Sequence, residues 1–151
     1  MTRKTFVLLG LAVGLAASYV WLFTNWLAAP RIQVYATPRP PRTVQRNVEV
    51  YPMSFALDGK YALTSVKVVE LAVYTTNRKS TPLWHLVAAS NAVPSKGFIY
   101  GRPIPGLKSA TPNARPQPLR PEVTYRLLLE AGRAKGTLDF RAPAIGPEAA
   151  Q

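Results

Sequence analysis

The chain has 151 residues and a formal net charge of +12, from 19 basic and 7 acidic residues. It contains no cysteine, which excludes disulfides, thiol nucleophiles and thiolate metal sites. Fifteen prolines interrupt valine- and tyrosine-rich runs, as is typical of short β-strands, and the basic charge favours anionic partners.

The first predicted element is a transmembrane anchor over residues 6–29, after a short N-terminal tail at 1–5. The run has no charged residue. At about 1.5 Å per residue, a helix of this length crosses a hydrocarbon core of about 30 Å. Aromatic residues gather in its second half, where an interfacial belt is expected, and Pro30 ends it. A cleaved signal peptide is the alternative, with a cut at Ala17 that would leave a strongly apolar N-terminus.

Two features of the anchor bear on its surroundings. Gly10 and Gly14 form a small-xxx-small pair that lets two helices approach closely, although such residues are common in membrane helices anyway. Basic residues after the anchor outnumber Arg3 and Lys4, which favours an internal C-terminal side. Long domains often translocate despite such charges, so we expect a domain on the periplasmic or extracellular side of the cytoplasmic (inner) membrane.

Three segments follow the anchor. Residues 30–47 predict a linker or stalk rich in proline and arginine, although the alternating IQVYA at its start also suits a first strand. A β-domain is expected over 48–142, and a disordered tail over 143–151.

Within the β-domain, the Asp58-Gly59 pair predicts a tight turn that joins strands at 53–57 and 61–69 into a hairpin. The loop at 102–120 is long and proline-rich, which suggests an irregular excursion exposed at one end of the domain. Further strands are expected at 72–75, 83–88, 98–100, 125–131 and 137–141. Between about seven and nine short strands of this kind predict an antiparallel sandwich.

The sequence LRPEVTY places Leu119, Pro121 and Tyr125 directly before the apolar run YRLLLEA. This spacing resembles the tyrosine corner of fibronectin type III and other immunoglobulin-like sandwiches. The resemblance implies that the chain crosses between two sheets here and that the Tyr125 hydroxyl bonds to upstream backbone. Glu122 departs from that family, which often has a glycine after the corner proline. The expected fold is all-β: an immunoglobulin- or fibronectin type III-like antiparallel β-sandwich preceded by one transmembrane helix.

Alternation along the strands predicts the core. Trp84 and Leu86 share one strand face, while His85 points to the opposite side. Leu127 and Leu129 share a face with Tyr125. These four apolar side chains are therefore expected inside the sandwich.

No grouping of residues predicts chemistry. His85 is the only histidine, and the seven carboxylates are scattered, so neither a catalytic triad nor a metal site is expected. No glycine-rich phosphate loop occurs either. We therefore expect a protein that is not an enzyme and binds no cofactor.

The basic residues are the remaining candidates for binding. They cluster in the linker and in the long loop, with possible anionic contacts at Arg39, Arg42, Arg46, Arg102, Lys108, Arg115 and Arg120. For an external domain, acidic lipid headgroups or envelope polymers are expected rather than nucleic acid. The same charge excess would also serve solubility alone.

Together these features predict a single-pass, membrane-anchored protein that acts as an accessory subunit or scaffold in a membrane or envelope complex. The alternative is a basic surface module that binds anionic lipid headgroups or envelope polymers. Immunoglobulin-like sandwiches serve mostly in adhesion, assembly and spacing, an expectation that comes from fold analogy.

Overall fold

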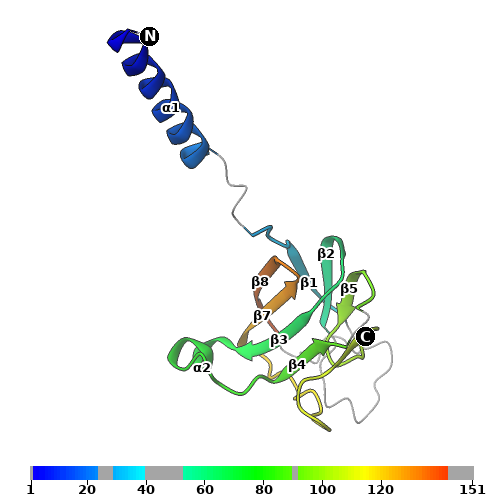
Figure 1. Ribbon diagram of the computed structural model, residues 1–151. Helices are drawn as coiled ribbons and strands as arrows, with labels where there is room; N and C mark the ends of the chain where they lie inside the picture. The colour runs from blue at the N-terminus through cyan, green and yellow to red at the C-terminus, as the bar shows by residue number, and fades with distance from the viewer. Residues whose placement is uncertain (1, 24–28, 40–52, 90–91, 143–151) are drawn as a thin grey trace.

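A computed structural model describes residues 2–23, 29–39, 53–89 and 92–142, which form an apolar helix and a mostly β domain (Figure 1). The predicted tail at 143–151 lies outside the described residues. The elements in chain order are α1 (Arg3–Phe23), β1 (Val34–Pro38), β2 (Met53–Tyr61), β3 (Ser65–Glu70), α2 (Leu71–Thr76), β4 (Trp84–Ala88), β5 (Ser95–Ile99), β6 (Leu107–Ser109), β7 (Thr124–Ala131) and β8 (Ala134–Arg141).

The N-terminal helix α1 is long and apolar enough to cross a membrane. It begins at Arg3, so most of the predicted tail at 1–5 is helical, because nothing in this stretch breaks a helix. None of its side chains is buried, which leaves its whole apolar surface exposed. The end of the predicted anchor falls partly at 24–28, outside the described residues.

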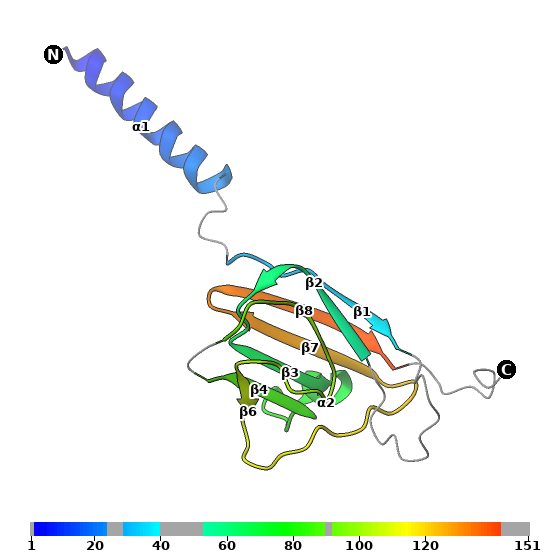
Figure 2. The same ribbon diagram turned by 90° about the vertical axis from the view of Figure 1, so that its right-hand side faces the viewer.

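The β-strands form two antiparallel sheets that face each other across one core. The smaller sheet has the order β1-β2-β5, and the larger has the order β6-β4-β3-β7-β8 (Figure 2). Alternate side chains of each strand point into the space between the sheets, as the burial of Phe55, Leu127 and Leu129 shows. An antiparallel arrangement of two sheets is therefore confirmed.

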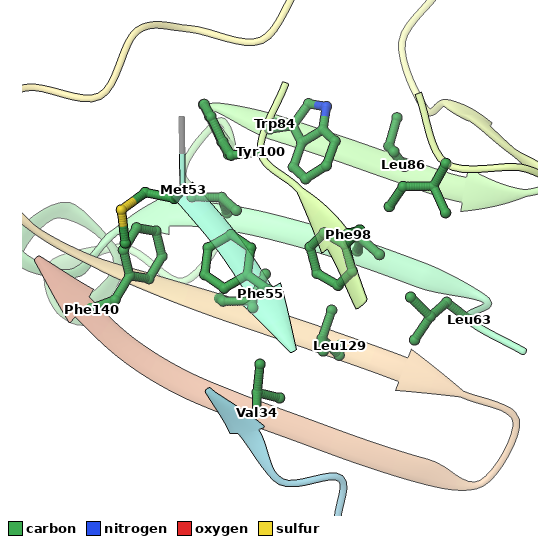
Figure 3. Close-up of a cluster of buried hydrophobic side chains, with 14 of the residues drawn as sticks. Val34, Met53, Phe55, Leu63, Trp84, Leu86, Phe98, Tyr100, Leu129 and Phe140 are labelled. Atoms are coloured by element: carbon green, nitrogen blue, oxygen red, sulfur yellow. The ribbon is translucent and has the colours of Figure 1, made fainter. Parts of the chain in front are cut away.

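Aromatic rings dominate the core and connect the two sheets (Figure 3). Phe55 on β2 packs against Phe98 at 5.2 Å and edge-to-face against Phe140 at 5.0 Å, measured between ring centroids. Trp84 on β4 contacts Phe98 at 6.1 Å and Tyr100 at 5.1 Å. All of these rings are buried, and Leu86 lies beside Trp84 on the same face of β4. Ring pairs at these separations add stability beyond the area they bury.

The linker predicted over 30–47 contains the first strand of the domain. β1 pairs antiparallel with β2, from Val34 opposite Leu57 to Pro38 opposite Met53. Ile32 and Val34 are buried in the core. The alternation at the start of this segment therefore belongs to a strand, and the domain begins well before residue 48.

The hairpin predicted around Asp58 and Gly59 is wrong. β2 continues through both residues, and neither has a positive φ. The backbone NH of Asp58 donates to the carbonyl oxygen of Gln33 at 3.1 Å, which keeps this end of β2 paired with the chain before β1. The chain leaves β2 at 62–64 and enters the other sheet, with Leu63 buried at the crossing. Alternating runs do not reveal whether the next strand joins the same sheet.

Two other predicted elements differ from the structure. The strand expected at 72–75 is the helix α2, where the hydroxyls of Thr75 and Thr76 donate to the carbonyl of Ala72. The loop at 102–120 contains the short strand β6, which pairs with β4. Buried Ile104 and Leu107 attach this loop to the core, so only part of it is an exposed excursion.

Candidate functional site

The outer face of the three-stranded sheet carries a hollow. Its floor is formed by Ser54 and Ala56 on β2 and by Gly97 on β5, with Gly97 directly opposite Ala56. These residues are small at positions where a sheet face usually carries larger side chains. The space left above them has a volume of about 470 Å³. Ile99, Pro103 and other apolar residues form a wall on the β5 side.

Gly97 is required by the backbone that lies beside it. A Cβ atom at this position would lie 2.5 Å from the carbonyl oxygen of Phe55, much closer than such atoms approach in proteins. The pairing of β2 with β5 is irregular between Ala56 and Tyr61. Ser95 also binds Gly97, because its hydroxyl donates to the Gly97 carbonyl at 2.6 Å and accepts from the Gly97 NH at 3.2 Å. The hollow is thus built into the strand pairing.

Three basic residues line the hollow: Arg39 after the end of β1, Lys96 on β5 and Arg102 after β5. All three are exposed, and no described residue that lines the hollow is acidic. Guanidinium groups bind carboxylates or phosphates through paired hydrogen bonds, and the Ser54 and Ser95 hydroxyls add polar groups to the same surface. The arrangement can therefore bind an anionic group next to an apolar one.

The structure separates the basic residues that the sequence grouped. It brings Arg39 and Arg102 to one hollow, although they lie in different parts of the chain. Lys108, Arg115 and Arg120 are exposed elsewhere and do not line it, while Arg42 and Arg46 lie outside the described residues. Lys96 was not predicted as a contact, since nothing local in the sequence marks it as a neighbour of Arg39.

Two tyrosines hold the end of loop 102–120 against the domain. The Tyr125 hydroxyl accepts a hydrogen bond from the backbone NH of Arg120 at 2.8 Å. The Tyr100 hydroxyl donates to the carbonyl of Gln117 at 2.6 Å, and burial raises the pKa of Tyr100. Leu119 is buried between these two attachments in the sequence, so 117–120 is fastened by both hydroxyls and by its own side chain.

The turn after Leu119 shows how Glu122 can stand where a glycine often follows the corner proline. Pro121 and Glu122 form a turn in which Glu122 has a φ of 64°, the left-handed region that favours glycine. Glu122 is held there by Arg141, whose guanidinium contacts its carboxylate at 2.6 Å and donates to its carbonyl at 2.9 Å. The chain has already entered the larger sheet at β6, so the sheet change lies before this turn rather than at it.

His85 faces outward from β4 beside Lys67 of β3. Partial burial, and secondarily the charge of Lys67, lowers the pKa of His85. Asp139 lies on β8, two strands beyond β3, and is bound to Arg126 at 2.6 Å. Since adjacent strands are about 4.8 Å apart, His85 and Asp139 cannot form a catalytic pair. No group of His, Asp and Glu that could hold a metal ion occurs among the described residues.

The two glycines of α1 lie in open surroundings. A Cβ atom added at Gly10 or Gly14 would meet no atom within 4 Å, leaving out the helix's own nearby backbone. Both positions are accessible for contact with another helix.

No protein-family model matches the chain, and no curated protein or solved structure matches it.

Proposed function

We propose that this protein is a non-enzymatic, single-pass membrane protein that presents a small β-sandwich outside the cytoplasmic membrane and holds an acidic segment of a partner protein in the hollow. It would act as an accessory subunit or scaffold of a membrane complex. The observation that carries the proposal is the grouping of Arg39, Lys96 and Arg102 around a floor of small side chains.

The sandwich is proposed to be immunoglobulin-like. If the strands other than β6 are lettered in chain order, β1, β2 and β5 take the places of A, B and E, and β3, β7 and β8 those of C, F and G. β4 lies at the side of C, whereas the fourth strand of constant-type domains lies beside E. The Tyr125 hydroxyl bond at the start of β7 supports the same class, because it corresponds to the tyrosine corner.

A protein segment suits the hollow better than a uniform polymer does. The lining combines basic residues with apolar ones, since Ile99, Pro103 and Ile104 line the same space. An acidic peptide with an apolar side chain would satisfy both kinds of surface. The hollow is an open depression of about 470 Å³, which leaves room for a side chain of a segment that lies across the surface.

The alternative function, binding of anionic polymer or lipid, is favoured by the spread of basic residues beyond the hollow. Lys108, Arg115 and Arg120 are all exposed. A polyanion that contacts many such groups would bind with a steep dependence on salt.

Site-specific crosslinking in intact cells tests the proposal. A photoreactive amino acid at Ala56, in the floor of the hollow, should crosslink one protein at an acidic segment. The same group at Thr137, on the exposed face of β8, serves as the control and should not. Changing Arg39 and Arg102 to Glu should abolish the crosslink, whereas changing Arg78 and Lys79 to Glu should leave it.

Binding of purified protein to two probes separates the alternatives. An acidic peptide that contains leucine should bind to the hollow, and the double change at Arg39 and Arg102 should weaken it at least tenfold. Polyphosphate that binds more tightly than the peptide, with little loss in that variant, would refute the peptide proposal in favour of a polyanion binder.

A further inference from the structure

The chain that leaves α1 enters the sandwich at one end, which we call the anchor-side end. This anchor-side end consists of the chain entering β1, the connection between β2 and β3, and the β7–β8 turn. Figure 2 shows the start of the domain beside that turn. The Ile32 NH donates to the Lys135 carbonyl at 2.9 Å, and the Lys135 NH donates to the Pro30 carbonyl at 3.1 Å. The chain leaving α1 is therefore tied to the β7–β8 hairpin as soon as it reaches the domain.

The length of chain between α1 and the domain limits their separation. Arg31, which forms a bridge with Lys135, lies eight residues after Phe23 (from 23 to 31). Even fully extended, eight residues span less than about 30 Å, at 3.3–3.6 Å each. If α1 crosses a bilayer as proposed above, the anchor-side end stays within this reach of the headgroups.

This end is rich in exposed basic side chains: Arg31, Lys60, Arg133 and Lys135. Lys135 is 3.6 Å from Glu130, with both side chains at least half exposed, so this ion pair neutralises little. The other three form no ion pair with any residue that the structure describes. Among the residues that the structure describes, Asp58 is the other carboxylate of this region. The basic groups thus exceed the acidic ones two to one in the part nearest the anchor.

We infer that the anchor-side end of the sandwich docks on anionic headgroups of the bilayer that α1 spans, through Arg31, Lys60, Arg133 and Lys135. Each basic side chain near an anionic leaflet adds to the attraction, and the short connection raises the local concentration of lipid at this end. β1 runs away from this end, and Arg39 and Arg102 lie where β1 and β5 reach the opposite end. Docking therefore turns that part of the hollow away from the membrane, toward a partner.

Energy transfer in nanodiscs tests this inference with the full-length chain. A single cysteine at Ala62, in the anchor-side connection, carries a donor dye, and the lipid carries the acceptor. The chain has no native cysteine to interfere. Donor dye at Val73 on α2, at the opposite end of β3, provides the comparison position. Discs of neutral phosphatidylcholine are compared with discs that contain about one third phosphatidylglycerol, a fraction chosen to make the surface strongly anionic.

We expect transfer from position 62 to rise in anionic discs and to return to the neutral-disc value in about 0.5 M salt, where charges are screened. Transfer from position 73 should fall or stay unchanged. Changing the four docking residues to Gln should remove the rise. A matched variant with Arg78, Lys79, Arg115 and Arg120 changed to Gln loses the same charge and should keep it.

Two results would overturn the docking inference while leaving the membrane anchor in place. One is equal energy transfer from position 62 in neutral and anionic discs. This measurement keeps all four docking residues, so it does not depend on whether the Gln variant folds. The other is loss of the rise in both Gln variants, which would show a response to total charge only. Protein that elutes apart from the discs would instead refute the membrane anchor, and the docking inference with it.

Discussion

Replacing Tyr125 by Phe removes one hydroxyl and leaves a ring of nearly the same shape. The ring is 1% exposed and packs 5.8 Å from Phe140, so its packing should persist. What is lost is the acceptor for the Arg120 NH at 2.8 Å. A buried donor without a partner costs about 1–3 kcal/mol, and because Arg120 itself is at the surface we expect about 1–2 kcal/mol.

Thermal unfolding of the full-length protein in detergent, followed by near-ultraviolet circular dichroism, measures this loss. For a domain of this size, each kcal/mol lowers the Tm by roughly 4–8 °C. Tyr100→Phe is the matched comparison, because it removes a hydroxyl that donates to the Gln117 carbonyl. It should lower the Tm less, since an unpaired carbonyl is tolerated better than an unpaired NH. An unchanged Tm in Tyr125→Phe would refute the idea that the hydroxyl stabilises this corner.

Three further predictions concern local backbone and charge. Glu122→Gly and Glu122→Ala both remove the ion pair with Arg141, but only glycine relieves the strain of the positive φ at this position. In urea unfolding, the Gly variant should therefore be about 1 kcal/mol more stable than the Ala variant. Equal stability of the two variants would contradict this reasoning. NMR titration of His85, the only histidine, should give a pKa below 6.5 that rises in Lys67→Gln. Because the unfolded chain binds this proton first, folding stability should fall as the pH drops below about 6.5. A pKa above that value would reverse the sign. Gly97→Ala should lower the free energy of unfolding by about 1–3 kcal/mol, because the new Cβ would force β2 and β5 apart. Gly59→Ala should lower it less, because the new Cβ would meet only the movable ring of Tyr61 at 3.3 Å. Equal stability of the two variants would contradict the close approach at Gly97.

Local periodicity predicted several elements and failed at others. The apolar runs gave α1 and β7, and two-residue periodicity gave the inward side of β4, because each depends only on neighbours in the chain. The segment 72–75 carries β-branched and aromatic residues, yet it is helical. There the guanidinium of Arg126 on β7 lies over the Tyr74 ring, 5.9 Å from the ring centre, a contact that no local pattern reveals.

The candidate site was predicted only in part, for a related reason. Arg39 and Arg102 were recognised as possible anion contacts because arginine clusters are visible in the sequence. Their meeting at one hollow depends on β2 lying between β1 and β5 in the smaller sheet. Lys96 joins them for the same reason, and the small floor matters only once Ala56 and Gly97 are opposite each other.

By itself, the sequence determined the apolar helix, the excess of positive charge, the absence of thiol chemistry and the alternation that buries Trp84, Leu127 and Leu129. These properties follow from composition and from neighbours a few residues apart. Only the tertiary structure decided that β2 passes straight through Asp58 and Gly59, that β1 belongs to the domain, and that basic residues from three segments share one hollow. Such features depend on which strands pair, and strand pairing is set by burial and hydrogen bonding between segments far apart in the chain.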